Sequence, residues 1–250
     1  MVNFTDEVRE IELELTDTAI SIGSKNQKAA LKLPKSMILL KSLATTSYCR
    51  SVSYYKGNTY VGLYNKTIEK VEADYKVTPK FIMHSGYSES VLVHRNRIYI
   101  LSPASVSVYN MSGRAVTSWL HSDEANVNKM AIIGDSLVIP DRSSQRLVVY
   151  SFSGEVKRCI SLQLSRGYLA ICSVDDDSVI ISDNKAGKVS RVNVTKGEVV
   201  WTSAVYNPEG VTSYGCDYVL VAAGDGAGIR ILGADTGGSS EVFDEFLLKI

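Results

Sequence analysis

Five short apolar segments recur along the chain at an almost constant spacing. They begin at Tyr60, Ile98, Leu137, Val179 and Val219, so successive segments start 38, 39, 42 and 40 residues apart. A repeat of about 40 residues indicates an architecture in which each unit buries its apolar face against the next unit. We therefore expect one repetitive domain over most of the 250 residues.

One repeat, residues 128–164, can be divided into strands from its residue pattern. Gly134 and Asp135 form a tight-turn pair between two apolar segments, which is typical of a β-hairpin. The expected strands are Lys129–Ile133, Ser136–Pro140, Arg146–Tyr150 and Glu155–Ile160. Four antiparallel strands in about 40 residues are typical of one blade of a β-propeller. The predicted fold class is therefore all-β, and the architecture is a β-propeller.

The number of blades depends on the N-terminal segment. Residues 9–43 can be divided into four weaker strands, which favours six four-stranded blades. In the alternative there are five blades, and Met37–Leu43 closes the ring as an outer strand. Residues 1–44 are then either a weak first blade or a linker with that closing strand, and 45–250 form the remaining blades. In both cases Glu241–Ile250 is expected to be the last outer strand.

Bulk properties exclude several classes of function. The chain has 27 basic and 27 acidic residues, which argues against a globally basic nucleic-acid binder but leaves room for a local basic patch. No apolar segment is long enough for a membrane-spanning helix, and the N-terminus lacks the pattern of a secretory signal. The four cysteines are widely spaced and are expected to be reduced thiols, which favours a cytoplasmic setting.

Polar loops after the second strand of two repeats supply the candidate binding residues. Asp141 and Asp183 stand where a strand ends, and a carboxylate there can accept backbone N–H bonds that hold the loop. We favour this structural role over direct contact with a ligand. In a propeller these loops gather at one end of the ring, where their side chains can contact a partner. The candidate partner-binding residues are Asp141, Arg142, Gln145, Arg146, Asp183, Lys185 and Asp225.

The same junctions carry a resemblance to a known family. Residues 139–150 and 181–189 each read as an apolar strand, Asp, a polar loop, a basic residue and a further strand, and this pattern resembles the blade of NHL-repeat propellers. Residues 121–131 and 206–211 are also similar to the propellers of invertebrate tripartite-motif-like proteins. The segment 102–105 departs from the pattern because it lacks the Asp, and residues 222–225 shift it. The resemblance implies a substrate- or partner-recruiting propeller without the zinc-binding parts of such proteins.

Motifs for chemistry are weak. Asp175-Asp176-Asp177 lacks the ligand spacing of a calcium loop and is expected to be a charged hairpin tip. His84, His94 and His121 fall in different repeats without metal-ligand spacing, and no nucleophile motif occurs. We expect no cofactor and no metal. Trp119 and Trp201 are expected to pack between blades.

Three functions compete. The first is a non-catalytic platform for a protein partner, because a rigid propeller displays many loops. The second is RNA binding, for which Arg142, Arg146, Lys185 and Lys188 would contact phosphates and which some NHL propellers perform. The third is metal-dependent hydrolysis of the lactonase type, which needs carboxylates on inner strands that hold almost none here. We favour the protein-binding platform.

Overall fold

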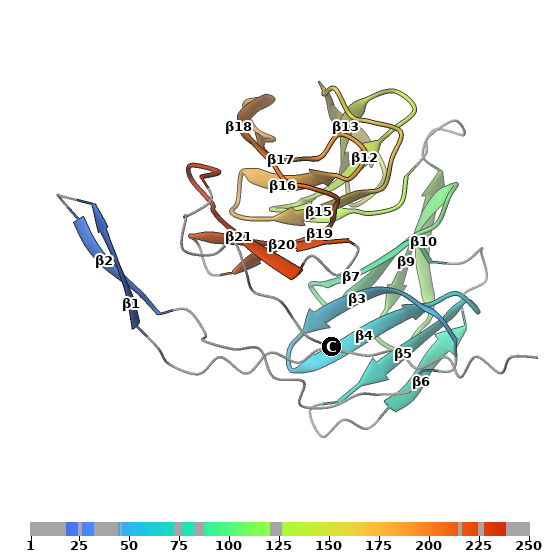
Figure 1. The fold of residues 1–250 in the computed structure, drawn as a ribbon. Helices are drawn as coiled ribbons and strands as arrows, with labels where there is room; N and C mark the ends of the chain where they lie inside the picture. Colours follow the sequence, from blue (N-terminus) through green and yellow to red (C-terminus); the bar gives the residue numbers. More distant parts are fainter. Residues whose placement is uncertain are drawn as a thin grey trace, which may run out of the picture. The chain divides into compact units, whose positions relative to one another are not determined.

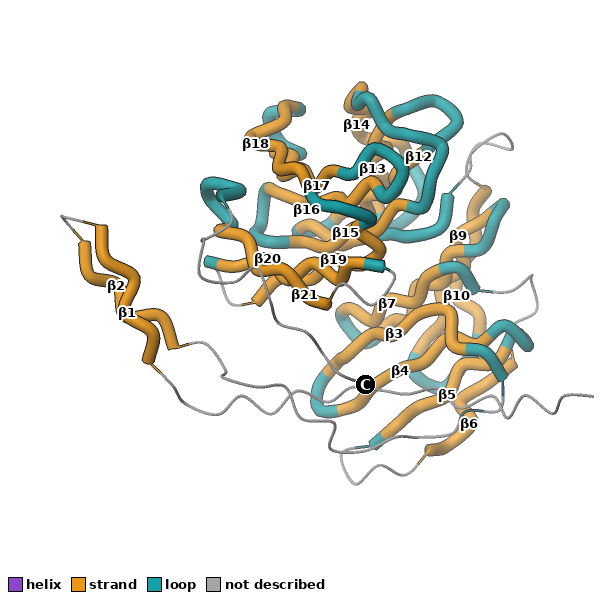
Figure 2. Tube along the Cα trace, viewed as in Figure 1, coloured by secondary structure: helices purple, strands orange, loops and turns teal. Residues whose placement is uncertain are grey.

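The computed structural model describes residues 19–24, 27–32, 45, 47–72, 77–82, 88–120, 127–214, 217–224 and 228–238 (Figure 1). Every regular element among these residues is a β-strand (Figure 2). In this part of the chain no helix is long and apolar enough to cross a membrane. The chain divides into two units, with the boundary between Tyr48 and Cys49. The first unit contains one antiparallel pair, β1 (Ala19–Ser24) and β2 (Gln27–Lys32).

The second unit is a β-propeller in which five sheets, called blades 1 to 5, follow one another along the chain. Blades 1 and 2 consist of β3 (Cys49–Tyr55), β4 (Asn58–Leu63), β5 (Thr67–Val71) and β6 (Val77–Ile82), then β7 (Ser90–His94), β8 (Arg97–Leu101), β9 (Ser105–Asn110) and β10 (Ala115–Leu120). Blade 3 consists of β11 (Ala131–Ile133), β12 (Ser136–Asp141), β13 (Arg146–Ser151) and β14 (Val156–Ser161). Blades 4 and 5 consist of β15 (Leu169–Ser173), β16 (Ser178–Asp183), β17 (Lys188–Asn193) and β18 (Glu198–Ala204), then β19 (Pro208–Tyr214), β20 (Tyr218–Ala223) and β21 (Gly228–Gly233).

The strand pattern confirms the predicted propeller and the plan of its blades. Strand order within each sheet follows chain order, and all neighbouring strands are antiparallel. In blade 3 all four predicted strands are present, although β11 begins at Ala131 rather than at Lys129. The described residues form five blades, as in the alternative prediction, while β1 and β2 overlap two of the four strands expected for a sixth. The other two, the closing strand Met37–Leu43 and the outer strand Glu241–Ile250 lie outside the described residues.

The core lies between blades, and this explains why the repeated segments are apolar on both faces. Side chains alternate across a strand. In β12, Leu137 and Ile139 pack into a cluster shared with blade 2, whereas Val138 between them packs into a cluster shared with blade 4. Two further clusters join blade 1 to blade 2 and blade 4 to blade 5. Because a middle strand is covered on both sides, its sequence is a continuous apolar run rather than an alternating one.

Outer-strand tryptophans fasten neighbouring blades together, as the sequence analysis expected. Trp119 of β10 lies against Gly154 in the next blade, and Trp201 of β18 lies against Gly237. A Cβ atom on Gly237 would come within 2.5 Å of the Trp201 ring, and both glycines also have positive φ angles of 93° and 64°. Only glycine meets both demands, because it has no Cβ atom and adopts positive φ without strain. These glycines in the later turns therefore set the approach of adjacent blades.

Candidate functional site

The predicted loops lie at one end of the propeller, which we call the loop face. It comprises the ends of the second strands, the starts of the third strands and the segments that lead into the innermost strands. Asp141 ends β12 there and is buried. Its Oδ1 atom accepts bonds from the backbone N–H of Ser143 (3.1 Å) and Ser144 (3.3 Å) and from the Ser143 hydroxyl (2.5 Å). Arg146 Nε lies 3.4 Å from Oδ2.

Asp183 has the equivalent position at the end of β16 and is also buried. It accepts bonds from the N–H of Ser165 (2.7 Å) and of Ala186 (3.1 Å), and from the Ser165 hydroxyl. In blade 2, where the sequence lacks this Asp, the buried Ser102 hydroxyl bonds to the carbonyl oxygen of Ser105 at 3.0 Å. Both carboxylates therefore hold loops, which is the role that the residue pattern favoured.

Hydrogen bonding keeps Asp141 ionised despite its burial. Burial alone raises the pKa of the carboxyl group. The hydroxyl and N–H donors of Ser143 and Ser144 and the charge of Arg146 lower it by more, so the pKa lies below its usual value. Asp141 is thus a fixed negative charge inside its own loop, and it positions the residues that follow it.

Two of the candidate residues, Arg142 and Lys185, meet at the segment that leads into β15. The half-buried Arg142 donates from Nη1 to the carbonyl oxygen of Gly167 in blade 4, at 2.8 Å. The exposed Lys185 lies on Gly167 as well, since a Cβ atom built there would be 2.5 Å from Lys185 Cβ. Burial lowers the pKa of Arg142, and the nearby Glu89 and Tyr168 oppose that change. The exposed Arg166 adds another positive charge to the same segment.

Of the other predicted residues, Gln145, Arg146 and Lys188 have partners of their own. Gln145 is exposed and has a positive φ of 52°, and its carbonyl oxygen accepts the N–H of Leu162 at 2.8 Å. Arg146 pairs with the carboxylate of its own loop. Lys188 donates to the carbonyl oxygen of Gln163 at 2.9 Å. Asp225 lies outside the described residues.

A recess of about 400 Å³ on the loop face joins residues from blades 1 to 4. Arg142 is the only member that the sequence analysis had named as a site residue. The complete lining is Cys49, Arg50, Glu89, Asn128, Lys129, Arg142 and Tyr168. Arg50, Glu89, Lys129 and Tyr168 each stand at or just before the start of an innermost strand. Their spacing of about 40 residues repeats the blade period, so aligning the blades on these starts would have found them.

Lys129, which precedes the innermost strand of blade 3, bonds to blade 1 and to the segment before blade 2. Its Nζ atom donates to the carbonyl oxygen of Arg50 in blade 1 at 2.9 Å and to that of Glu89 before blade 2 at 3.3 Å. The same Nζ atom lies 5.9 Å from the centre of the Tyr168 ring. Arg50 Nη2 pairs with both carboxylate oxygens of Glu89 at 2.9 Å. The recess is thus built from contacts between residues far apart in the sequence.

Asn128 supplies a polar atom that nothing in the described part of the chain satisfies. The residue is 6% exposed and lines the recess. Its Oδ1 atom is buried and accepts no hydrogen bond from the described residues. A buried carbonyl oxygen without a donor costs about 1–3 kcal/mol. A ligand N–H group in the recess would remove that cost once the Asn128 side chain turns Oδ1 toward it, because the atom itself is buried.

A channel of about 790 Å³ runs between the innermost strands of all five blades. Each blade contributes to its wall, for example through Val52, Leu92, Ile132, Cys172 and Val211. The described part of the wall holds the carboxylates Asp175 and Asp176, both at the hairpin turn after β15. Among the described inner strands the one carboxylate is Glu209 of β19, and it does not line the channel.

Two candidate features for metal binding are clusters of metal-ligating side chains and the three histidines. Among the described residues no group of three His, Cys, Asp or Glu side chains could hold a metal ion. His94 ends β7 beside Phe152, with ring centres 5.7 Å apart, and burial lowers its pKa. His84 and His121 lie outside the described residues. The expectation of no metal, no cofactor and no catalysis stays a prediction.

Three exposed tyrosines lie on the loop face, whereas the exposed Tyr54 lies at the opposite end of β3. Tyr64 follows β4, Tyr168 precedes β15 and Tyr206 precedes β19, and all three are exposed. The Arg50 guanidinium lies 5.9 Å from the centre of the Tyr64 ring. Tyrosine and arginine are the side chains enriched where proteins bind one another.

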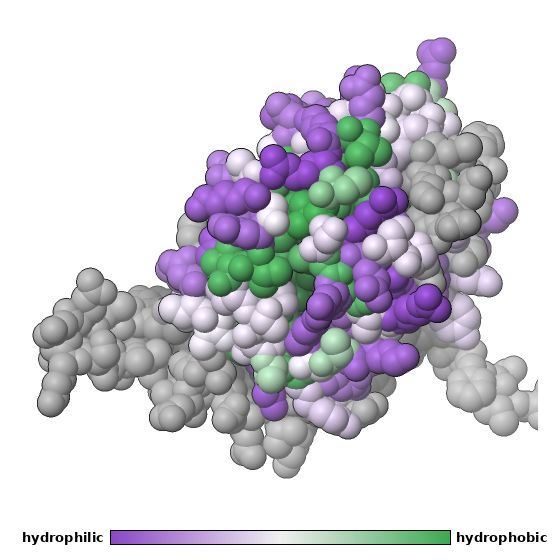
Figure 3. Space-filling view, turned by 90° about the horizontal axis from the view of Figure 1, so that it is seen from above, coloured by the Kyte–Doolittle hydropathy of each residue, from purple (hydrophilic) through white to green (hydrophobic). Residues whose placement is uncertain are grey.

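A different surface exposes apolar side chains without this chemistry. Seen from above, several apolar patches lie between polar side chains (Figure 3). The exposed valines of the described residues that lie in outer strands are Val116, Val156, Val199 and Val200. Valines scattered on outer strands are ordinary for a protein surface, and they provide a control surface in the experiments below.

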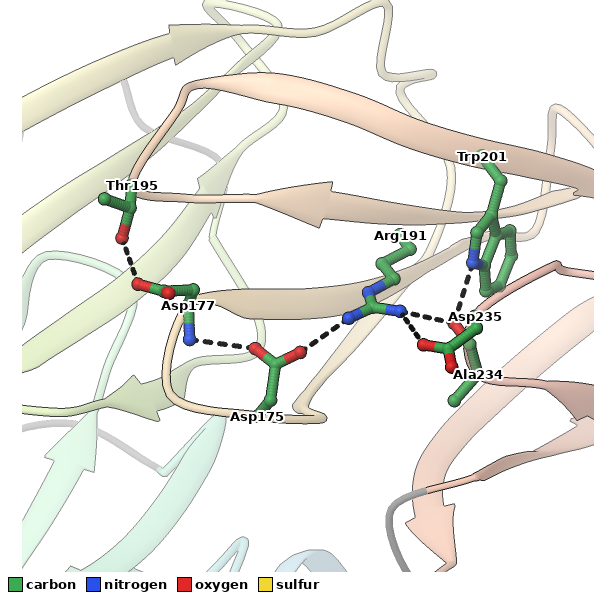
Figure 4. Close-up of polar contacts among 7 residues, drawn as sticks. All are labelled: Asp175, Asp177, Arg191, Thr195, Trp201, Ala234 and Asp235. Carbon is green, nitrogen blue, oxygen red and sulfur yellow. Dashed lines mark hydrogen bonds and ion pairs between the residues drawn. The ribbon is translucent and has the colours of Figure 1, made fainter.

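The opposite end of the propeller, the turn face, carries the acidic hairpin tip 175–177 between β15 and β16. Arg191 joins it to blade 5 (Figure 4). Its Nη2 donates to Asp175 at 2.6 Å, and its Nη1 donates to Asp235 Oδ1 at 2.7 Å and to the carbonyl oxygen of Ala234 at 2.8 Å. The tip is therefore a charged turn, as predicted, and the structure adds that it is linked to blade 5 through Arg191. The Asp175 carboxylate accepts from Arg191, and the Asp177 carboxylate accepts from the Thr195 hydroxyl.

Comparisons with known proteins show the fold alone. No family profile matches the sequence, and no curated protein matches it. Among solved structures, streptogramin B lyase is similar with a TM-score of 0.64 and 13% identity over 77% of this chain and 67% of that one. The WD40 propeller domain of Doa1 has a TM-score of 0.63 and 17% identity over 76% and 66%. BamB from Moraxella catarrhalis has a TM-score of 0.53 and 12% identity over 90% and 78%. The chain spans about two thirds of the first two proteins.

Proposed function

We propose that this propeller is a non-catalytic platform that binds a protein partner on its loop face. The observation that carries the proposal is the combination there of exposed tyrosines with basic side chains around a recess. Tyr64, Tyr168 and Tyr206 supply rigid amphipathic contact area, and Arg142 and Lys185 supply charge. The similarity to a WD40 propeller domain supports a scaffold of this kind, because such rings display loops on a stiff frame.

A finer identity is part of the same proposal. The Asp-containing junctions at Asp141 and Asp183 resemble NHL blades, so we take the chain as the partner-recruiting propeller of a longer tripartite-motif-like protein. A reading frame upstream of Met1 with zinc-ligand cysteines and heptad repeats would support it. Cys49, Cys159 and Cys172 are free thiols in the structure, which agrees with the proposed reducing, cytoplasmic setting.

The test compares two variants with three substitutions each, one on the loop face and one on the outer strands. The triple variant Tyr64→Ser, Tyr168→Ser and Tyr206→Ser removes the exposed rings of the loop face. The control variant Val116→Thr, Val156→Thr and Val199→Thr alters three exposed side chains on outer strands. Partners captured by the wild-type chain and identified by quantitative mass spectrometry should be lost at least tenfold from the tyrosine variant and kept by the control.

Two outcomes contradict this proposal. If both variants retain the same partners, the loop face is not the binding surface. If nuclease treatment removes the captured material and binding weakens steeply between about 50 and 200 mM salt, the platform binds RNA instead. Circular dichroism on both variants checks that the fold is unchanged.

A further inference from the structure

We propose that the recess on the loop face binds one acidic residue of a partner's peptide chain. The recess is the hollow of about 400 Å³ lined by Cys49, Arg50, Glu89, Asn128, Lys129, Arg142 and Tyr168. This inference rests on the proposed function and adds the chemistry of the group that is bound.

The charged side chains that line the recess are mostly cationic. The lining holds three cationic side chains and one carboxylate. Arg50 and Glu89 pair with each other at 2.9 Å, and three cations against one carboxylate leave the lining with a net positive charge. Partial burial strengthens the field of this charge because less water screens it. The recess therefore favours an anionic group.

The ammonium group of Lys129 can donate one further hydrogen bond to a ligand. An ammonium group has three N–H donors, and Nζ of Lys129 uses two of them on the carbonyl oxygens of Arg50 and Glu89. Both acceptors are neutral, so the positive charge of Lys129 is not cancelled by them. The third N–H can donate to a carboxylate in a charge-assisted bond, which is about twice as strong as a neutral one.

Asn128 decides which kind of anion fits. Its buried Oδ1 atom needs a donor. An acidic residue within a peptide brings a carboxylate for Lys129 and Arg142 and a backbone N–H for Asn128. A phosphodiester group carries acceptors only, so in RNA the donor for Oδ1 would have to come from a ribose hydroxyl or a base, whereas a peptide carries an N–H beside each acidic side chain. The exposed Tyr168 ring beside Lys129 provides a surface on which the peptide can pack.

The experiment uses random twelve-residue peptides, acetylated and amidated at their ends, selected on the whole chain. The tightest peptide is then made with each Asp or Glu replaced in turn by Asn or Gln, and affinities are measured by isothermal titration calorimetry. One replacement should weaken binding ten- to hundredfold, as expected for the loss of one charge-assisted pair. Replacement of the remaining acidic residues should change affinity less than threefold.

Three protein variants test whether the acidic residue of the peptide binds in the recess. In Lys129→Met the acidic peptide and its amide form should bind equally, because the charge that distinguishes them is gone. Lys196→Met makes the same change of charge on the turn face, where Lys196 is exposed, and should keep the full difference. Arg142→Gln is a second variant in case Lys129→Met fails to fold, and it should reduce the difference as well.

Three outcomes overturn the inference. In the first, the selected peptides would tolerate replacement of every acidic residue. In the second, the difference in affinity between the acidic peptide and its amide form would survive in both Lys129→Met and Arg142→Gln. In the third, a twelve-residue oligouridylate would displace the peptide from the wild-type recess. In the first two cases the recess is not an acidic subsite, while the proposed loop-face platform still stands or falls with the tyrosine variant. Failure of the tyrosine variants to lose partners refutes the proposed function separately.

Discussion

The bridge made by Arg191 between blades 4 and 5 allows a quantitative test of how this ring is held together. Arg191 is only 14% exposed and donates to Asp175, Asp235 and the carbonyl oxygen of Ala234. The variant Arg191→Met keeps most of the apolar stem and removes the guanidinium. The Ala234 oxygen stays satisfied, because the Trp201 indole N–H also donates to it at 2.8 Å.

The expected cost follows from the exposure of each partner. A hydrogen bond to a charged group contributes about 1.5–3 kcal/mol when buried, and an exposed ion pair contributes about 0.2–1 kcal/mol. Asp235 is exposed and Asp175 is partly exposed, so the free energy that each bond contributes should lie closer to the range for exposed ion pairs. We expect Arg191→Met to lower the free energy of unfolding by about 1.5 kcal/mol, which lowers Tm by about 3–6 °C for a domain of this size.

The assay is urea unfolding followed by tryptophan fluorescence, with thermal unfolding beside it. Trp201 reports on the same interface, since it contacts blade 5 through Ala234 and Gly237. The matched control is Arg95→Met, because the ion pair of Arg95 with Asp135 is also on the turn face but its side chains are 64% and 67% exposed. The control should lose at most about 0.5 kcal/mol.

One result would refute the reasoning. If Arg191→Met is no less stable than Arg95→Met, the bonds between blades 4 and 5 contribute nothing that a surface ion pair does not. A double-mutant cycle with Asp175→Asn identifies the part due to that one pair, for which we expect a coupling of about 1 kcal/mol. A coupling near zero would place the effect of Arg191 elsewhere.

Four further predictions concern the core, the blade junctions and the ionisable groups. Leu137→Ala, at a fully buried position between blades 2 and 3, should lower the free energy of unfolding by about 2–5 kcal/mol in urea titrations, and a loss below 1 kcal/mol would contradict the packing. Gly154→Ala should also destabilise the fold and change the fluorescence of the tryptophan against it, because a Cβ atom there overlaps that ring and φ is +93°. Burial raises the pKa of Cys172 to about 12, so a thiol reagent at pH 8 should label the exposed Cys159 and leave Cys172 unmodified, as read by peptide mass mapping. The folded-state pKa of Asp141 lies below its unfolded value, so its contribution to stability is present above about pH 4 and is lost as pH falls below that. In Asp141→Asn the free energy of unfolding should therefore fall less steeply as the pH is lowered below about 4. An unchanged slope in that pH range would exclude this contribution.

Local sequence patterns were enough to determine the blades. The turn pair Gly134-Asp135, the apolar run from Leu137 to Ile139 and the later turn at Gly154 are features of neighbouring residues, and neighbouring residues decide where a hairpin turns. The repetition of these features at about 40 residues predicted the propeller. The carboxylate at Asp141 was also predicted as a loop holder, because its partners lie two and three residues away.

Only the tertiary structure decided which residues form the recess. Arg50, Glu89 and Lys129 are about 40 residues apart, and none of them belongs to a motif that carries chemistry by itself. Closing the blades around a common channel brings the starts of their innermost strands together, so a lysine of blade 3 can donate to a carbonyl oxygen of blade 1. The repeat determines the shape of each unit from short-range preferences, while the contacts between units depend on a ring geometry that no single stretch of sequence contains.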